Sequence, residues 1–364
     1  MMDPDTAKPK RTFRIATADR VSRPAAAVGC IVLLVLVLLP TFAGRNLIQD
    51  LIFLFYMLAL AQCWNLLAGY AGLISVGQQA FVGLGGYVLF ALTLVGGLNP
   101  LLAIPVAGIV SAAFALPTAL IVFRLRGAYF AIGTWVVAEV YRLGFAQVKA
   151  LGGGTGTSLT PSVTSSMPGI EWIKTLLDVR TPAARDIASY WLALALVVGT
   201  LAFVYLLLRS RQGLALGAIR DREAAAASLG VDITSIKLAV YVATAAMTGM
   251  IGALIYLQKA RISPDAAFSV LDWTAYVIFI TVIGGIGTIE GPIIGAVVFY
   301  LMQRYLADFG AWYLILLGTL GILVMLFAPR GLWGLLAGRY DLTLFPTRRR
   351  LETNRTKNGL SSES

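Results

Sequence analysis

Long apolar stretches, separated by short polar segments, run along most of the chain and give the first expectation about its structure. A helix that crosses a membrane needs about 20 mainly apolar residues to span the hydrocarbon core. About ten segments fit this requirement, and proline or glycine marks most of the junctions between them. The segments are residues 25–43, 47–68, 72–95, 100–123, 127–147, 188–208, 238–258, 268–286, 291–307 and 312–328.

The third and eighth of these segments are richer in glycine and polar residues than the others. The third contains GLISVGQQAFVGLGGY, and the eighth contains AYVIFITVIGGIGTIEG. Broken and re-entrant helices at membrane depth are interrupted in this way. Each of the two segments therefore has two readings, a straight span or a re-entrant, broken one.

The composition agrees with a membrane protein. Hydrophobic residues make up 58% of the chain and charged residues only 13%, whereas about a quarter of the residues in soluble domains are charged. The chain has no histidine, and its two cysteines, Cys30 and Cys63, lie in apolar runs. We therefore expect an all-α polytopic membrane protein without a metal site, a cofactor or a disulfide.

Basic residues indicate how the chain is oriented, because Lys and Arg favour short cytoplasmic segments. With ten spans, three basic regions fall on the cytoplasmic side: the N-terminal tail 1–24, the segment 209–237 and the C-terminal tail 337–364. Lys259 and Arg261 fall outside and are the exception. We expect both termini in the cytoplasm and a disordered C-terminal tail. Whether this tail lies at anionic lipid or also contacts a partner stays open.

The spans divide into two groups of five around a polar segment, residues 149–187, on the outer side. An odd number of spans in each group makes the second half inverted relative to the first. Inverted halves are common in transporters, and the substrate path then lies between them. We therefore expect a single transmembrane domain over residues 25–336, built from two inverted five-helix halves.

The segment SRQGLALGAIRDREAAAASLGVDITSIK, residues 210–237, interrupts the apolar pattern with charge. Asp221 stands where an N-cap is expected before the helix-forming REAAAASL. Gly230 is a candidate left-handed C-cap, and Asp232 or Thr234 a candidate cap of the next helix. The segment is thus predicted to hold a short helix that lies on the membrane surface or against a partner.

Five stretches, including this one, resemble the LivM-type permeases of branched-chain amino-acid transporters. They occur in the family's order and lie between residues 47 and 336. One feature departs from the wider class of importer permeases, in which a glycine follows the glutamate of the EAA motif by six residues; here Gly230 follows Glu223 one position later. The stretches are WNLLAGYAGLISVGQQAFVGLGGY (64–87), RGAYFAIGTWVVAEVYRL (126–143), RQGLALGAIRDREAAAASLGVD (211–232), IGGIGTIEGPIIGA (283–296) and LFAPRGLWGLL (326–336).

The resemblance implies a permease subunit of an ATP-binding cassette (ABC) importer in the bacterial cytoplasmic (inner) membrane, carrying branched-chain or related amino acids. It implies as partners ABC ATPase subunits, a second, LivH-like permease subunit and an extracytoplasmic solute-binding protein, and no nucleic acid. The chain has no Gly-Lys pair, which a Walker A motif requires, so ATP hydrolysis is expected on the partner and not here. By resemblance, the segment 209–237 is the ATPase-coupling loop. Its candidate residues are Arg220, Asp221, Arg222, Glu223 and Gly230.

Polar side chains within apolar spans are expensive, so they line a path or bond to other helices. Both roles stay open for the polar residues of the first half. Glu139 and Arg142 are three positions apart, a spacing that favours an ion pair within one helix. The candidates for the translocation path are Asn65, Ser75, Gln78, Gln79, Thr134 and Glu139.

Three other functions are compared with the importer. A urea- or amide-type ABC permease has a similar architecture, and this subunit says little about the solute. An ion-coupled secondary transporter needs charged relays at mid-membrane, for which Glu139 is nearly the only candidate. An integral membrane enzyme would need a constellation of histidine, cysteine or paired carboxylates at a suitable depth, and this sequence offers none.

Overall fold

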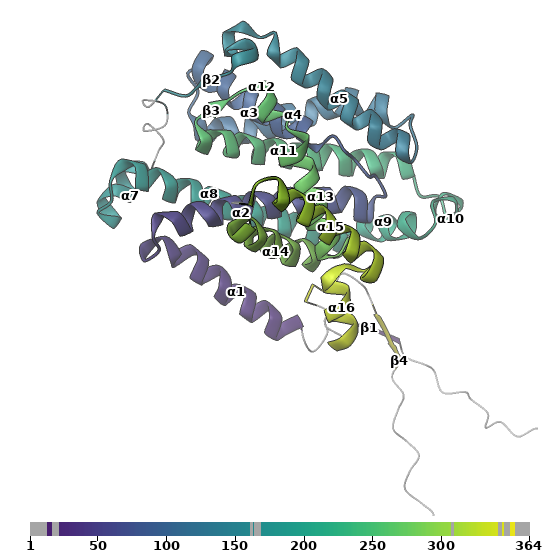
Figure 1. Cartoon of the computed structure of the whole chain (residues 1–364). Coiled ribbons are helices and arrows are strands. Elements are labelled where there is room, and N and C mark those ends of the chain that lie inside the picture. Colours follow the sequence, from purple (N-terminus) through teal and green to yellow (C-terminus); the bar gives the residue numbers. More distant parts are fainter. Residues whose placement is uncertain are drawn as a thin grey trace, which may run out of the picture.

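The structure is a computed structural model that describes residues 13–16, 22–160, 163, 169–306, 309–340, 344–345 and 350–353. Much of the two predicted tails, 1–24 and 337–364, therefore lies outside the described residues. Helices dominate the described part (Figure 1), which confirms the all-α prediction.

The helices follow the apolar runs, and capping residues define several of their starts. Asn99 accepts a hydrogen bond from the backbone amide of Leu101 and caps a helix that opens with Pro100. The α-helices are α1 (Ser22–Leu38), α2 (Arg45–Asn65), α3 (Gln78–Phe90), α4 (Pro100–Val122), α5 (Ala128–Ala146), α7 (Ile170–Leu177), α8 (Thr181–Arg209), α9 (Arg211–Asp221), α10 (Glu223–Ser228), α11 (Ile233–Lys259), α12 (Pro264–Ala267), α13 (Tyr276–Gly284), α14 (Glu290–Leu306), α15 (Ala311–Phe327) and α16 (Gly331–Tyr340).

Three π-helical turns extend these helices, and two short antiparallel strand pairs join distant parts of the chain. The turn η2 (Leu66–Tyr70) continues α2, η3 (Ala91–Val95) continues α3, and η6 (Leu271–Ala275) leads into α13. Strand β1 (Phe13–Ala16) pairs with β4 (Arg350–Thr353), and β2 (Thr157–Ser158) pairs with β3 (Arg261–Ile262). The remaining short 3-10 turns are η1 (Leu39–Thr41), η4 (Lys149–Leu151) and η5 (Gly153–Thr155).

Each of the ten apolar segments overlaps at least one helix, although fewer reach the length and hydropathy of a membrane span. Within the described residues six helical stretches do so, and a seventh is added if the bent pair 312–327 and 331–339 counts as one span. Helices α1, α14 and α15 have 17 residues each. The six stretches are Arg45–Tyr70, Gln78–Val95, Pro100–Val122, Thr181–Arg209, Ile233–Lys259 and Pro264–Gly284.

The third and eighth segments differ from their predicted bounds. Residues 71–77 are not helical, so α3 starts at Gln78 and not at residue 72. The glycines and Ser75 at the start of the segment favour an irregular backbone over a helix. The eighth segment starts earlier than predicted, at Pro264, and its helical stretch continues through η6 and α13 to Gly284.

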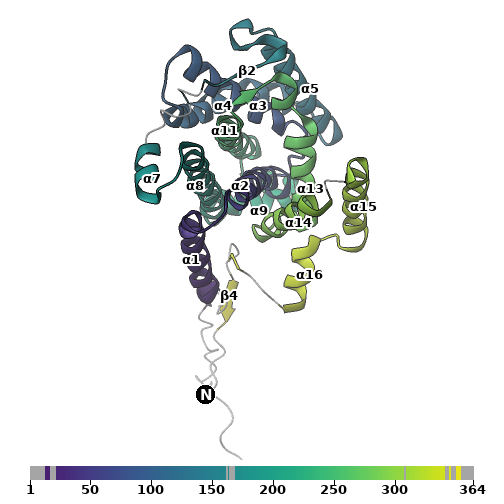
Figure 2. The ribbon, with the colours of Figure 1, turned by 60° about the vertical axis from the view of Figure 1, so that its left-hand side comes forward.

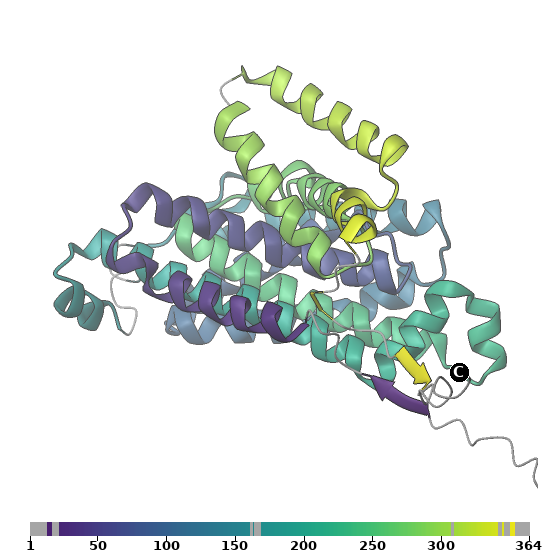
Figure 3. The same cartoon turned by 90° about the horizontal axis from the view of Figure 1, so that it is seen from below.

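The core forms around two long helices that each lie among helices of the other half of the sequence. Helix α2 packs against α8, α11, α13 and α14, and 83% of its membrane-length window is buried. Helix α11 packs against α3 and α4, where Gly85, Gly249 and Gly252 allow close approach (Figure 2). Helices α14 to α16 stand to one side of this core (Figure 3).

Two polar parts of the chain occupy opposite ends of the bundle. Helix α7, in the predicted outer segment 149–187, and the β2–β3 pair lie at one end, whereas α9 and α10 lie at the other (Figures 1 and 3). Helix α8 already begins at Thr181, inside that predicted segment. The two segments that were expected on different sides of a membrane are therefore separated by the length of the bundle.

Candidate functional site

Buried amide side chains meet at the start of α3. Gln78 and Gln79 have only 3% and 1% of their surface exposed. Gln78 Nε2 donates to the carbonyl oxygen of Leu60 on α2, 2.9 Å away. The hydroxyl of Thr274, in η6, donates to Gln79 Oε1. The backbone amide of Gln79 donates back to Thr274 Oγ1 at 3.3 Å. The start of α3 is thus fixed to one helix of each half.

The irregular segment 71–77 connects these amides to α5. The indole nitrogen of Trp64 donates to the carbonyl oxygen of Ser75 at 2.8 Å, and the amide of Val76 donates to Thr134 Oγ1 at 3.0 Å. A Cβ atom at Gly77 would lie 2.2 Å from the carbonyl oxygen of Thr134, so only glycine allows this approach. The structure therefore brings together four of the six path candidates: Ser75, Gln78, Gln79 and Thr134.

Three side-chain atoms in this part of the core have no hydrogen-bond partner among the described residues. They are Gln62 Oε1, Gln78 Oε1 and Gln79 Nε2. An unpaired buried amide atom costs about 1–3 kcal/mol, so such atoms are sites for water or a polar solute. One free acceptor and one free donor on neighbouring glutamines suit the ammonium and the carboxylate of a zwitterion.

Asn65 bonds to a different turn. Its Nδ2 donates to the carbonyl oxygen of Thr288 at 2.8 Å, and its Oδ1 accepts from the amide of Gly287 at 2.7 Å. Gln62, one helical turn earlier, donates to the carbonyl oxygen of Ile289 at 2.6 Å. Asn65 thus clamps the connection between α13 and α14, residues 285–289, which we call the glycine turn.

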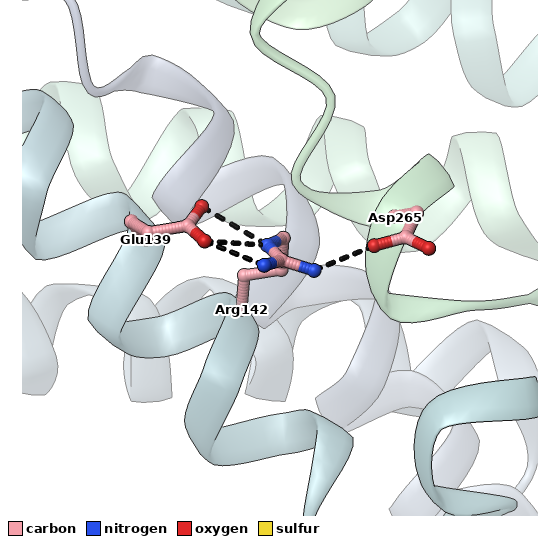
Figure 4. A network of polar contacts seen from close by, with 3 residues as sticks. All are labelled: Glu139, Arg142 and Asp265. Atoms are coloured by element: carbon pink, nitrogen blue, oxygen red, sulfur yellow. Dashed lines mark hydrogen bonds and ion pairs between the residues drawn. The ribbon is translucent and has the colours of Figure 1, made fainter.

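Glu139 lies in an ion-pair network at the edge of the bundle (Figure 4). Arg142 Nε donates to both carboxylate oxygens of Glu139, at 2.9 and 3.0 Å, which confirms the ion pair expected from their spacing. Arg142 Nη1 also donates to Asp265 Oδ1 at 2.6 Å. The network therefore ties α5 to α12, and a guanidinium compensates the charge of Glu139.

The loop 209–237 forms two helices, α9 and α10, and corrects one prediction. Asp221 is the last residue of α9 and not an N-cap; the extended Arg222 occupies the N-cap position of α10. The prediction was wrong because the helix preceding it, which starts at Arg211, runs through residue 221. Gly230 has a φ of +81°, as a left-handed C-cap requires.

Two exposed side chains of the loop 209–237 bond to other parts of the chain, and others make no such bond among the described residues. Glu223 forms an ion pair with Lys237 of α11, and Arg220 donates to the carbonyl oxygen of Gly287 at 3.3 Å. Arg222 is exposed, and Leu229 has 81% of its surface exposed. The loop therefore combines internal bonds with a free outer face.

Asp232 is the N-cap of α11, which confirms one of the two residues predicted as candidates for this cap. Its carboxylate accepts from the amide of Ser235 at 3.1 Å and from the Ser235 hydroxyl at 2.6 Å. The hydroxyl bond, followed by the backbone bond, lowers the pKa of Asp232 below its usual value. The start of α11 is thereby fixed to the end of the loop.

Two residues of the amide sites were missed by the sequence reasoning. Gln62 and Thr274 are fully buried and complete the bonds of the glycine turn and of Gln79. Both stand as polar residues inside otherwise apolar segments, which is the signal used for the first-half candidates. Applying it to the second half would have found Thr274.

The fold and these sites define the chain as a polytopic helical membrane protein whose helices are interrupted around buried amides. Its residues 46–326 match the family model described as the permease component of branched-chain amino acid transport systems, so the chain belongs to that family. This confirms the resemblance found in the sequence.

Curated relatives give the same assignment. The chain is 33% identical over 279 residues to the high-affinity branched-chain amino acid transport system permease protein LivM of Salmonella typhimurium. It is 32% identical over 281 residues to the protein of the same name from Escherichia coli. Each alignment covers 74% of this chain and 65% of the relative, so the chain matches about two thirds of their length.

A more distant relative is a probable branched-chain amino acid transport permease protein LivM of Methanocaldococcus jannaschii. It is 24% identical over 240 residues, which cover 62% of this chain and 64% of that protein. No solved structure matches the chain significantly.

Proposed function

We propose that this chain is the permease subunit of an ABC importer that moves branched-chain or related amino acids across the bacterial cytoplasmic membrane. The family match over residues 46–326 is the observation that carries the proposal. In this scheme, separate ATPase subunits hydrolyse ATP, an external binding protein delivers the solute, and a second, LivH-like permease subunit completes the translocation unit.

The proposed topology has ten spans over residues 25–336, two inverted halves and both termini in the cytoplasm. The antiparallel pairing of β1 with β4 supports an even number of spans, because strands near the two termini can pair only on one side of a membrane. Phe345 supports the same side for the C-terminal end: its ring contacts Tyr205, near the start of the loop 209–237. The reciprocal packing of α2 and α11 supports two related halves.

The proposed path passes the start of α3. Gln78 and Gln79 offer a free amide oxygen and a free amide nitrogen in an otherwise apolar core. Apolar walls with a few amides suit leucine-like solutes, whose side chains are apolar and whose termini are charged. The hydroxyls of Ser75 and Thr134 accept hydrogen bonds from the backbone amides of Gly77 and Val76 and so hold the irregular backbone beside these amides. Asn65 and Glu139 serve packing and charge compensation.

The proposed ATPase-coupling site is the outer face of the loop 209–237. Asp221, Arg222 and Leu229 are exposed there, at the end of the bundle that holds α9 and α10 (Figure 1). Glu223 pairs with Lys237 and Gly230 ends the helical segment, so both shape the loop. The loop is bonded to the bundle on one side and has a surface that a partner can reach on the other. A movement of a bound ATPase subunit can therefore be transmitted through the loop to the transmembrane helices.

Reconstitution in proteoliposomes tests the proposal. The complete complex is expected to take up labelled leucine, isoleucine or valine only with binding protein outside and ATP inside. Uptake of urea or acetamide in place of these amino acids would support the related amide permease instead. Uptake that continues without ATPase subunits and stops with a protonophore would support an ion-coupled transporter and refute the importer.

A further inference from the structure

Arg220 is exposed and belongs to the loop 209–237, but its guanidinium lies against the bundle. It lies in the last turn of α9, and its Nη1 donates to the carbonyl oxygen of Gly287 at 3.3 Å. Its guanidinium carbon lies 5.9 Å from the ring centroid of Tyr70, the last residue of η2, within the range of a cation–π contact. The side chain thus bridges the end of α2 and the glycine turn.

Gly287 of the glycine turn lies directly against this guanidinium. Gly287 has a φ of +75°, and a Cβ atom there would lie 2.6 Å from Arg220 Nη1 and 2.9 Å from its Cζ. In η2, a Cβ atom at Gly69 would lie 2.6 Å from the amide nitrogen of Gly287. Three elements therefore meet at a point that excludes any larger residue.

The same turn is bonded to the centre of the bundle. Asn65 and Gln62 hold three consecutive residues of the turn to α2 through the hydrogen bonds described above. Gly331, at the start of α16, also touches it, because a Cβ atom there would lie 2.3 Å from the Cα of Gly285. A displacement of the turn must therefore displace or break contacts with α2, α13, α14 and α16.

Arg222 gives a contrast within the same loop. It follows Arg220 by two positions, is exposed and marks the break between α9 and α10. Both arginines are exposed. The side chain of Arg220 is bonded to the bundle, whereas none of the hydrogen bonds or ion pairs among the described residues involves the side chain of Arg222.

We infer that Arg220 is a positioning residue that ties α9 to the glycine turn, so that movement of the loop reaches α2, α13 and α14, and that it does not itself bind the ATPase. This assigns Arg220 a different role from that of the other candidate coupling residues, and it rests on the proposed importer function.

The test in the assembled complex compares Arg220→Gln with Arg339→Gln, the same change at an exposed position of α16. Arg220→Gln is expected to keep ATPase subunits at the wild-type ratio but to lower the number of leucine molecules transported per ATP at least tenfold. Gly287→Ala, which places a methyl group against the guanidinium, is expected to give the same uncoupling. Arg339→Gln should change neither quantity more than twofold.

Two results in the complex would overturn the inference. Loss of the ATPase subunits from the Arg220→Gln complex would make Arg220 a direct partner contact. An Arg220→Gln complex that couples as well as Arg339→Gln would remove the proposed link.

A second measurement uses the full chain alone in detergent and does not depend on any partner. Because Arg220 and Tyr70 are in contact, the loss of Tm in the double variant Arg220→Gln/Tyr70→Leu is expected to be smaller than the sum of the single losses. Additive losses would refute the internal bond. If no ATPase subunit joins the wild-type chain, the proposed function fails, and this measurement still decides the role of Arg220.

Discussion

Gly85 of α3 lies against Gly249 of α11 so closely that a Cβ atom on Gly85 would stand 2.0 Å from the carbonyl oxygen of Gly249. Gly252, three residues further along α11, makes the reciprocal approach, because its Cβ atom would lie 2.2 Å from the carbonyl oxygen of Val82. Membrane helices associate through packing of this kind, since lipid supplies little hydrophobic drive between them. The contact joins the two halves of the sequence.

Gly85→Ala is therefore expected to destabilise the chain by about 1–3 kcal/mol, because the methyl group meets backbone that cannot rotate away. Thermal unfolding in detergent measures the loss. Gly199→Ala on α8 is the matched control, since nothing lies within 4 Å of a Cβ atom there. Equal stability of the two variants would contradict the close contact of α3 and α11.

Asn65→Leu should lower the stability of the chain because it removes two hydrogen bonds between α2 and the glycine turn. The substitution keeps the size of the side chain but leaves the amide of Gly287 and the carbonyl oxygen of Thr288 without their bonds. Because both groups are only half-buried, each lost hydrogen bond is expected to cost about 0.5–1.5 kcal/mol. Asn46→Leu, at an exposed position of the same helix, should have little effect in the same unfolding measurement. A stable Asn65→Leu variant would show that the turn holds without this clamp.

Gln78→Leu and Gln79→Leu should each lower leucine uptake about tenfold, the effect of losing one or two hydrogen bonds to a charged group. Assembly with the partner subunits should persist, because the proposed partner surfaces lie elsewhere. Uptake by proteoliposomes and subunit ratios after purification measure the two effects. Gln147→Leu, at the exposed end of α5, serves as the control. Unchanged uptake in both variants would exclude these amides from the path.

The lowered pKa of Asp232 leads us to expect that the stability of the folded chain depends on pH. Its pKa is lowered in the folded chain by the hydroxyl and the amide of Ser235. A lowered folded pKa means that the cap stabilises the chain above the unfolded pKa, and that this contribution is lost as the pH falls through the folded pKa. The difference in unfolding midpoint between wild type and Asp232→Asn should therefore shrink on acidification. A difference that is constant between neutral and acidic pH would contradict this role of the cap.

The apolar pattern predicted where helices form because each segment carries its own signal of length and hydropathy. The sequence left open whether the segment 72–95 is a straight or a broken helix, and Asp221 was misassigned because the preceding helix α9 runs through it. The end of a helix depends on a few residues and on bonds that the apolar pattern does not contain. The irregular backbone at Ser75 is held by Trp64, and that of Val76 by Thr134. The pattern within the segment contains neither partner.

Candidate residues were found from their polarity, but their partners could not be. Gln79 and Thr274 are 195 positions apart, and Arg220 and Gly287 are 67 apart. A charged residue in a polar loop reads as outward-facing unless the fold brings an acceptor beside it. For this reason the sequence analysis grouped Arg220 with Arg222, whereas in the structure the guanidinium of Arg220 contacts the glycine turn and Tyr70.

The bonds of Gln62 and Asn65 also impose an order on biosynthesis. Their acceptors in the glycine turn follow them by 227 and 223 positions, so α2 is synthesised long before these partners exist. Until α13 and α14 emerge from the ribosome, two buried amides of the future core have no intramolecular acceptor, and leaving them in lipid is costly. A nascent chain stopped before residue 285 consequently carries α2 without the acceptors that these two amides have in the complete fold.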